Sequence, residues 1–333
     1  MSSSKEVSDL SLISEPIGDL FGSLPTNPED YRSCLLSDEQ ISFYKANGYL
    51  TEVRVLTDEQ CNRIIGEYNR FLLWNQPVEN SDGKDDAHRL NFPEKDLLYE
   101  YHSNQSTDPN NVVTHMLGHW RISSLFHDLI FLPQVTVPTS QLLAACHPSN
   151  EKLLPVQFWH DQLFAKPPFY GGGVAWHQDY SYWTRTEPMQ HLTVHIALDD
   201  QTVENGTIHY IPGSHRWHRI KDGKEVPLPI TDIDFKNMDS VRDILTEEEK
   251  QQFQPMPSLL KKGHASFHHP LAVHGSFPNR TAAPRRAAVL NYFAEGTRSN
   301  SDEPLMQGVP VIPHGQPLES RFFPKVFDPK WLQ

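Results

Sequence analysis

The stretch Trp176-His177-Gln178-Asp179 lies near the middle of a chain of 333 residues and places a histidine two positions before an aspartate. In an extended strand, residues two apart point to the same side, so His177 and Asp179 can reach one metal ion together. A histidine from a distant strand would complete a face of three ligands. Two histidines and one carboxylate that leave the remaining positions open suit non-haem iron(II). A tripeptide of this kind also arises by chance, because the chain has 18 His and 42 acidic residues.

A second stretch, His274-Gly275-Ser276, is followed by the pair Arg285-Arg286. A dicarboxylate that chelates a metal at one end leaves a carboxylate at the other, and the planar fork of an arginine binds a carboxylate bidentately. Ser276 can add a hydrogen bond from the face that carries His274. Arg285 and Arg286 point to opposite faces of a strand, so only one of them can face inward.

Three elements together resemble the phytanoyl-CoA dioxygenase superfamily. The elements are His177-Gln178-Asp179, then Asn205-Gly206 through Ile211-Pro212-Gly213-Ser214-His215, then His274-Gly275-Ser276 with Arg285 eleven residues after the histidine. Their order and spacing are specific, and the resemblance covers roughly residues 36–295.

The resemblance implies a mainly β fold with flanking α-helices, namely the double-stranded β-helix, a cupin-like jelly roll. It implies an iron(II)- and 2-oxoglutarate-dependent dioxygenase of the hydroxylase type, which uses O₂ to hydroxylate an unactivated C–H bond of a small organic molecule and releases succinate and CO₂. Ascorbate is expected as a reductant. His177, Asp179 and His274 would bind the iron, and Arg285 with Ser276 would hold the distal carboxylate of 2-oxoglutarate.

Other site residues follow from the same resemblance. Gln162 matches a position that often contacts the cosubstrate, and Trp183 matches an aromatic residue that faces the substrate in some members. His160, on the same strand as Gln162, is a second candidate for substrate binding. His195 stands where many members have Trp and is either a cosubstrate contact or a core histidine; Met116 stands where a Lys often faces the cosubstrate.

The third metal ligand has competitors. They are His264, His268 and His269. His274 is preferred because it alone has a serine two residues later and an arginine eleven residues later, as in the family. The same spacing favours Arg285 over Arg286.

Two helices are predicted before residue 75. Ser37 and Gln40 have the spacing of a capping box, as do Thr57 and Gln60, and Asn47-Gly48 favours a left-handed end of the first helix. A strand is predicted between the two helices, over residues 48–55.

Further along, residues 75–112 are polar and irregular, with loops predicted over 80–86 and 104–111, and residues 113–132 are expected to contain a helix that ends near Pro133. From about residue 135, short apolar or alternating runs predict strands of a jelly roll. These runs are Leu154–Ala165, His191–Leu198, Thr207–Ile211, Ala265–His268 and Ala287–Phe293.

The expected organisation is a tail or lead-in over residues 1–35 and one oxygenase domain over 36–333. Within that domain, residues 36–133 are assigned to a helical part, 134–295 to the jelly-roll core and 296–333 to a C-terminal extension.

The net charge of −13 argues against general nucleic-acid binding and against an anionic membrane surface. The three cysteines lack C-x-x-C spacing, and no signal peptide, transmembrane run or C-terminal peroxisomal signal is seen, so a cytoplasmic location is expected. The expected partner is a small-molecule substrate, and the oligomeric state cannot be read from the sequence. The alternatives are a non-catalytic protein that binds metal and 2-oxoglutarate as a sensor or scaffold, and a jelly-roll metalloenzyme that does not use 2-oxoglutarate.

Overall fold

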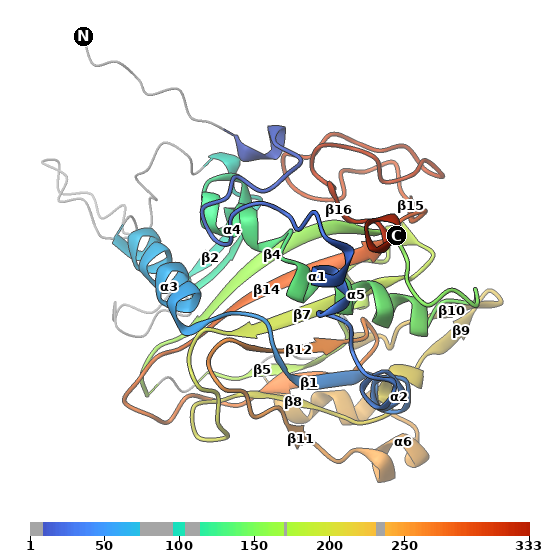
Figure 1. The fold of residues 1–333 in the computed structure, drawn as a ribbon. Coiled ribbons are helices and arrows are strands. Elements are labelled where there is room, and N and C mark those ends of the chain that lie inside the picture. The colour runs from blue at the N-terminus through green and yellow to red at the C-terminus, as the bar shows by residue number, and fades with distance from the viewer. Residues whose placement is uncertain (1–8, 74–95, 104–113, 170–171, 231–236) are drawn as a thin grey trace, which may run out of the picture.

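The computed structural model describes residues 9–73, 96–103, 114–169, 172–230 and 237–333 (Figure 1). Its centre is an eight-stranded antiparallel sheet in the order β1-β12-β7-β14-β4-β3-β2, with β16 also paired to β4. The strands of this large sheet are β1 (Tyr49–Arg54), β2 (Glu100–Ser103), β3 (Thr114–Leu117), β4 (Val156–Lys166), β7 (His191–Ala197), β12 (His264–His268), β14 (Arg285–Ala294) and β16 (Lys325–Phe327).

A smaller antiparallel sheet has the order β11-β8-β13-β5. Its strands are β5 (Val174–His177), β8 (Ile208–Tyr210), β11 (Met256–Pro257) and β13 (His274–Ser276). Two short antiparallel pairs complete the strands: β6 (Thr186–Glu187) with β15 (Arg298–Ser299), and the hairpin of β9 (Arg219–Lys221) with β10 (Lys224–Val226). Side chains from both larger sheets line one cavity between them. The mainly β jelly roll expected from the sequence is confirmed.

Helices flank the strands rather than interrupt them. They are α1 (Pro28–Arg32), α2 (Asp38–Asn47), α3 (Asp58–Leu73), α4 (Ser124–Leu129), α5 (Pro133–Ala145) and α6 (Glu247–Gln252). Helix α5 contacts β4, β7, β14 and β16, and so packs against the middle of the large sheet (Figure 1). The opposite face of that sheet is left for the cavity.

The predicted helix caps near the N-terminus are confirmed. Ser37 and Gln40 exchange side-chain and backbone hydrogen bonds, and α2 ends at Gly48 with a φ of 80°, a conformation that glycine adopts without strain. Thr57 and Gln60 exchange the same pair of bonds at the start of α3, at 2.9 and 3.2 Å.

The helix expected within residues 113–132 is confirmed by α4 (Ser124–Leu129), but a strand precedes it in the same segment. Residues Thr114–Leu117 form β3, and a turn of 3-10 helix and the short α4 follow. The buried carboxylate of Asp161 accepts hydrogen bonds from the backbone N–H groups of Gly118 and Trp120, both at 2.7 Å. These two hydrogen bonds hold the backbone in a turn directly after β3, so a continuous helix cannot run through this segment.

Helix α5 was not predicted, because residues from about 134 onward were assigned to the strand-rich core. Pro133 begins this helix instead of ending an earlier one, and Pro138 lies inside it. The helix is also rich in β-branched residues and buried on almost all sides, so it shows no amphipathic period. Within the C-terminal extension, β16 joins the large sheet beside β4.

The described part of the lead-in, from residue 9, lies against the rest of the chain. The carboxylate of Asp128 accepts hydrogen bonds from the backbone N–H groups of Ile17, Gly18 and Leu20, at 2.6 to 3.2 Å. The loops predicted over 80–86 and 104–111 lie outside the described residues. Within the described ranges, no helix combines the length and the apolar character needed to span a bilayer.

Candidate active site

A cavity of about 350 Å³ lies between the two larger sheets. Its wall from the large sheet comes from β3, β4, β7, β12 and β14, and its wall from the smaller sheet comes from β5, β8 and β13. The residues that matter below are His115, Gln162, Lys166, His177, Asp179, Thr193, His195, His268, His274, Ser276 and Arg285.

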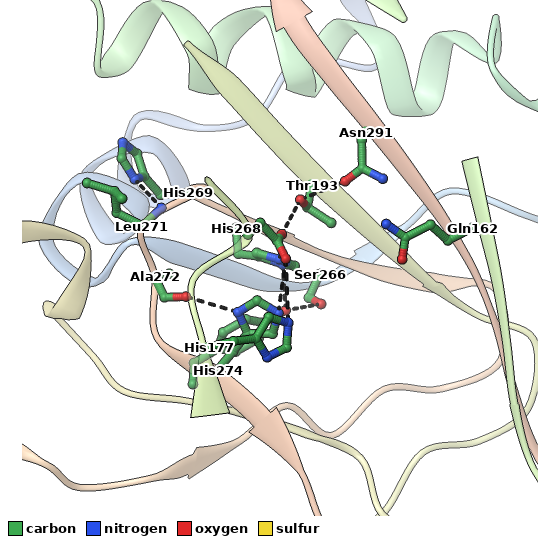
Figure 2. Close-up of polar contacts among 12 residues, drawn as sticks. Gln162, His177, Thr193, Ser266, His268, His269, Leu271, Ala272, His274 and Asn291 are labelled. Carbon is green, nitrogen blue, oxygen red and sulfur yellow. Dashed lines mark hydrogen bonds and ion pairs between the residues drawn. The ribbon is translucent and has the colours of Figure 1, made fainter. Parts of the chain in front are cut away.

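Three potential metal ligands meet at this cavity (Figure 2). His177 ends β5, Asp179 follows two residues later, and His274 begins β13. Because β5 and β13 pair with His274 opposite His177, the two imidazole rings lie 4.2 Å apart between centroids. One ligand atom from each residue lies within 4.8 Å of the others, and Oδ1 of Asp179 is 3.6 Å from Nε2 of each histidine.

Backbone carbonyls orient both histidines. Nδ1 of His177 lies 2.8 Å from the carbonyl oxygen of Ala175, and Nδ1 of His274 lies 2.9 Å from that of Ala272. A carbonyl oxygen can only accept, so Nδ1 carries the hydrogen in both rings. The lone pair of each Nε2 then points at the shared space, as in histidines that bind metals.

The charges of the three groups also fit a divalent cation. Burial, with His177 close by, lowers the pKa of His274 well below its ordinary value, so this ring is neutral at physiological pH. Burial alone would raise the pKa of Asp179, but the neighbouring His274 and the hydrogen bond from His268 hold it well below its ordinary value. A neutral imidazole beside an ionised carboxylate is the state in which these groups coordinate metals.

Arg285 lines the same cavity and is only 3% exposed. Its Nη2 donates to the carbonyl of Gly206 at 2.6 Å, whereas its Nε is buried without a hydrogen-bond partner. Burial lowers the pKa of Arg285 to about 10, which leaves it charged at neutral pH. Arg286 lies on the other face of β14 and binds both carboxylate oxygens of Asp199, at 2.7 and 2.8 Å.

The sequence analysis missed a second cation, Lys166. This lysine is 3% exposed and lies directly opposite Arg285 in the antiparallel pairing of β4 with β14. Its Nζ donates to the hydroxyl of Ser276 at 2.8 Å and to the carbonyl of Phe277 at 2.5 Å. Burial, together with Arg285, lowers the pKa of Lys166 to about 6.

Within the described residues, no carboxylate forms an ion pair with either Lys166 or Arg285. Both cations face a cavity, and the Nε of Arg285 has an unused hydrogen. A carboxylate bound between them would satisfy that donor and neutralise charge that is otherwise costly to bury. Gln162 and Lys166 lie an even number of residues apart on β4 and both face the cavity. This alternation was the signal in the sequence that could have identified Lys166 as a cavity residue.

Three further predicted positions can be placed. Gln162 extends from β4 toward the site, with Oε1 3.4 Å from Nε2 of His115 (Figure 2). His195 lines the cavity and also contacts Oε1 of Gln201 at 3.1 Å, so it is both a wall residue and a hydrogen-bonded one. Met116 is buried in the hydrophobic core, and its neighbour His115 lines the cavity instead. Met116 therefore does not contact the cavity among the described residues.

The two residues expected on the substrate side lie beside the cavity and not in its wall. His160 and Trp183 pack edge to face with 5.7 Å between ring centroids, and both are buried. Neither lines the cavity within the described part of the chain. Their role in substrate binding remains a prediction without support from this geometry.

His268, a competitor for the third ligand position, has a different place from His274. Its Nε2 lies 2.9 Å from Oδ2 of Asp179, the oxygen that also accepts from the hydroxyl of Thr193 at 2.6 Å. The three ligand atoms that converge belong to His177, Asp179 and His274. Sequence reasoning did not find the contacts of Thr193 and His268, because they depend on strand pairing between β7 and β12.

The comparison with known families agrees with this geometry. A sequence model of the phytanoyl-CoA dioxygenase (PhyH) family matches residues 44–287. The chain belongs to the phytanoyl-CoA dioxygenase family. This match confirms the resemblance drawn from the three sequence elements.

The proteins to which the chain is similar differ in how much of their length aligns with it. The chain is 29% identical over 141 residues to a probable alpha-ketoglutarate-dependent hypophosphite dioxygenase of Stutzerimonas stutzeri, covering 42% of this chain and 46% of the relative. It is 31% identical over 150 residues to the phytanoyl-CoA dioxygenase domain-containing protein 1 of Bos taurus, covering 44% and 48%. These alignments span about half the length of each relative. Phytanoyl-CoA dioxygenase 1 of Oryza sativa subsp. japonica is 25% identical over 84% of this chain and 96% of its own length.

Solved structures share the fold at low identity. The non-heme alpha ketoglutarate dependent carbocyclase SnoK from nogalamycin biosynthesis gives a TM-score of 0.61 at 20% identity, covering 91% of this chain and 99% of that one. The apo form of EctD from S. alaskensis gives a TM-score of 0.57 at 17% identity, with 92% and 91% covered. At such identities the similarity concerns the jelly roll alone.

Proposed function

We propose that this phytanoyl-CoA dioxygenase family member is an iron(II)- and 2-oxoglutarate-dependent oxygenase that hydroxylates an unactivated C–H bond of a small organic molecule. One observation carries the proposal. A single cavity holds a histidine–aspartate–histidine cluster together with two buried basic side chains, Arg285 and Lys166, that have no acidic partner among the described residues. A metal site and a site for a remote carboxylate are the two requirements of 2-oxoglutarate as a cosubstrate.

In this proposal, His177, Asp179 and His274 hold the iron, and Arg285, Lys166 and Ser276 hold the distal carboxylate of 2-oxoglutarate. When bound, iron(II) with 2-oxoglutarate and O₂ supplies the oxidising chemistry, with succinate and CO₂ as the co-products. The protein fixes the position of the cosubstrate at both ends and keeps the surroundings dry.

The reaction type is proposed as hydroxylation. Asp179 supplies the carboxylate that related halogenases lack, which favours hydroxylation over halogenation. Structural neighbours named as a carbocyclase and an epimerase show that the same fold also serves other outcomes, and at 20% identity or less they do not assign one here. The named relatives hypophosphite dioxygenase and methylphosphonate hydroxylase support a small substrate.

The direct test is turnover of 2-oxoglutarate without a prime substrate. Purified protein supplied with iron(II), ascorbate and 2-oxoglutarate under air is expected to release succinate slowly, measured by chromatography against a sample without iron. An Asp179→Ala protein is the matched negative control. Binding of metal and 2-oxoglutarate without any succinate would favour a sensor or scaffold, and failure to bind 2-oxoglutarate would favour a metalloenzyme of another kind.

The pKa of Lys166 predicts how cosubstrate binding depends on pH. With a pKa of about 6, Lys166 is mostly neutral above that pH in the free protein, and a bound carboxylate raises its pKa by favouring the charged form. Binding therefore takes up a proton, so affinity should fall by up to about tenfold per pH unit above the free pKa, until the pKa of the complex is reached.

Anaerobic titration of the iron-loaded protein with 2-oxoglutarate at several pH values measures this dependence. Lys166→Met should bind 2-oxoglutarate more weakly than wild type near the pKa of Lys166 in the free protein, and its affinity should depend much less on pH. Lys221→Met, which replaces an exposed lysine, should bind 2-oxoglutarate as wild type does. An unchanged slope in Lys166→Met would remove Lys166 from the cosubstrate site.

A further inference from the structure

The two oxygens of the Asp179 carboxylate have different surroundings. Oδ1 faces Nε2 of His177 and of His274, at 3.6 Å each. Oδ2 accepts hydrogen bonds from the hydroxyl of Thr193 at 2.6 Å and from Nε2 of His268 at 2.9 Å (Figure 2). One oxygen is thus presented to the ligand cluster, and the other is occupied by two donors.

A buried network fixes the His268 donor. Since the carboxylate of Asp179 accepts, Nε2 of His268 carries a hydrogen, and in the neutral ring Nδ1 must accept. The hydroxyl of Tyr210 lies 3.0 Å from this Nδ1 and 2.8 Å from the hydroxyl of Ser266. Ser266, Tyr210 and His268 are all at most 1% exposed, so each group depends on these partners for its hydrogen bonds.

The Thr193 donor is held in place by its strand. Its hydroxyl is 2.6 Å from Oδ2 of Asp179 and its single hydrogen serves this carboxylate, so Oδ1 of Asn291, at 2.9 Å, cannot accept the same hydrogen. Thr193 lies on β7 and is opposite Asn291 on β14 and His268 on β12. Neighbouring central strands of the large sheet, β7 and β12, therefore position both side chains that donate hydrogen bonds to Asp179.

We propose that Thr193 and His268 are positioning residues that hold Asp179 as a ligand through one oxygen only. The inference rests on the proposed function, in which Asp179 binds iron. An ionised carboxylate oxygen has about two lone-pair sites, and those of Oδ2 are both used. Coordination through both oxygens would occupy a position that the two-histidine, one-carboxylate arrangement leaves open for the cosubstrate.

The test compares variants that remove or keep each donor. Thr193→Val and His268→Leu remove a donor, while Thr193→Ser and His268→Gln keep one in a similar place. Loss of a residue that orients a metal ligand typically weakens metal binding about 10- to 100-fold. Anaerobic titration with manganese(II) or iron(II) is expected to show this loss for Val and Leu, and recovery of most of the affinity for Ser and Gln.

Two further measurements separate positioning from general damage. Thr139→Val removes a buried hydroxyl in α5 that bonds only the carbonyl of Val135 at 2.8 Å, and should leave metal affinity unchanged. The visible spectrum of bound cobalt(II), which responds to coordination number and geometry, should change in Thr193→Val and return toward wild type in Thr193→Ser. Because valine and threonine have nearly the same shape, Thr193→Val tests the proposal even if His268→Leu fails to fold.

The outcomes are distinct. Wild-type metal affinity and an unchanged cobalt spectrum in both Thr193→Val and His268→Leu would overturn the positioning role while leaving the metal site in place. A wild-type protein that binds none of these metals would overturn the proposed function, and the positioning role with it.

Discussion

Replacing His177, Asp179 or His274 by alanine is expected to reduce iron(II) binding and succinate release below detection while the fold is kept. Each residue supplies one of three ligand atoms that lie within 4.8 Å of one another, so two remaining ligands cannot form the facial set. Anaerobic iron titration measures the loss, and circular dichroism with thermal unfolding checks the fold.

His264→Ala is the matched control, because His264 lies on β12 outside the ligand cluster. Among the described residues, its side chain has one hydrogen-bond contact, to the nearby carbonyl of Lys262. Wild-type activity in any of the three ligand variants, with iron still bound, would contradict the assignment. Activity of His274→Ala that is lost on further replacement of His268 would instead move the third ligand to His268.

Arg285→Ala is expected to weaken 2-oxoglutarate binding by roughly two to three orders of magnitude, because removing one partner of a buried charge pair costs about 3–5 kcal/mol. Arg285→Lys should recover only part of the loss, since an ammonium cannot reproduce the bidentate fork. Anaerobic titration of the iron-loaded variants with 2-oxoglutarate measures both effects.

Arg286→Ala is the natural control, since Arg286 lies on the other face of β14 and is occupied by Asp199. It should change 2-oxoglutarate affinity little, although the unpaired Asp199 will lower stability. If Arg286→Ala weakens 2-oxoglutarate binding and Arg285→Ala does not, the register of β14 is off by one residue. Arg286, and not Arg285, would then face the cavity.

Local sequence patterns were enough for much of the fold and for the core of the site proposal. Alternation predicted β4, β7, β8, β12 and β14, and the two capping boxes predicted where α2 and α3 begin. Helix α5 was not predicted because its sequence gives conflicting signals. It has several β-branched residues, contains a proline and is buried on almost all sides.

The residues that sequence reasoning missed depend on long-range pairing. Lys166 gains its place only because β14 aligns it with Arg285, and His268 reaches Asp179 only because β12 lies beside β7. Whether Met116 or its neighbour His115 faces the cavity has the same origin, since adjacent residues of a strand point to opposite faces. Alternation along β4 shows that Lys166 shares a face with Gln162, but spacing along the chain does not show which strands lie side by side.

The alignment of Lys166 with Arg285 also bears on which 2-oxo acids the protein can accept. Like charges directly opposite each other on neighbouring strands repel, and with burial this lowers the pKa of Lys166 to about 6 in the free protein. A 2-oxo acid that ends in a methyl group, such as pyruvate, would chelate the metal but offer no carboxylate to pair with Arg285 or to restore the charge of Lys166. Selectivity for a dicarboxylate would then come from one carboxylate that satisfies both basic groups, and the dicarboxylate should raise the melting temperature of the metal-loaded protein more than pyruvate does.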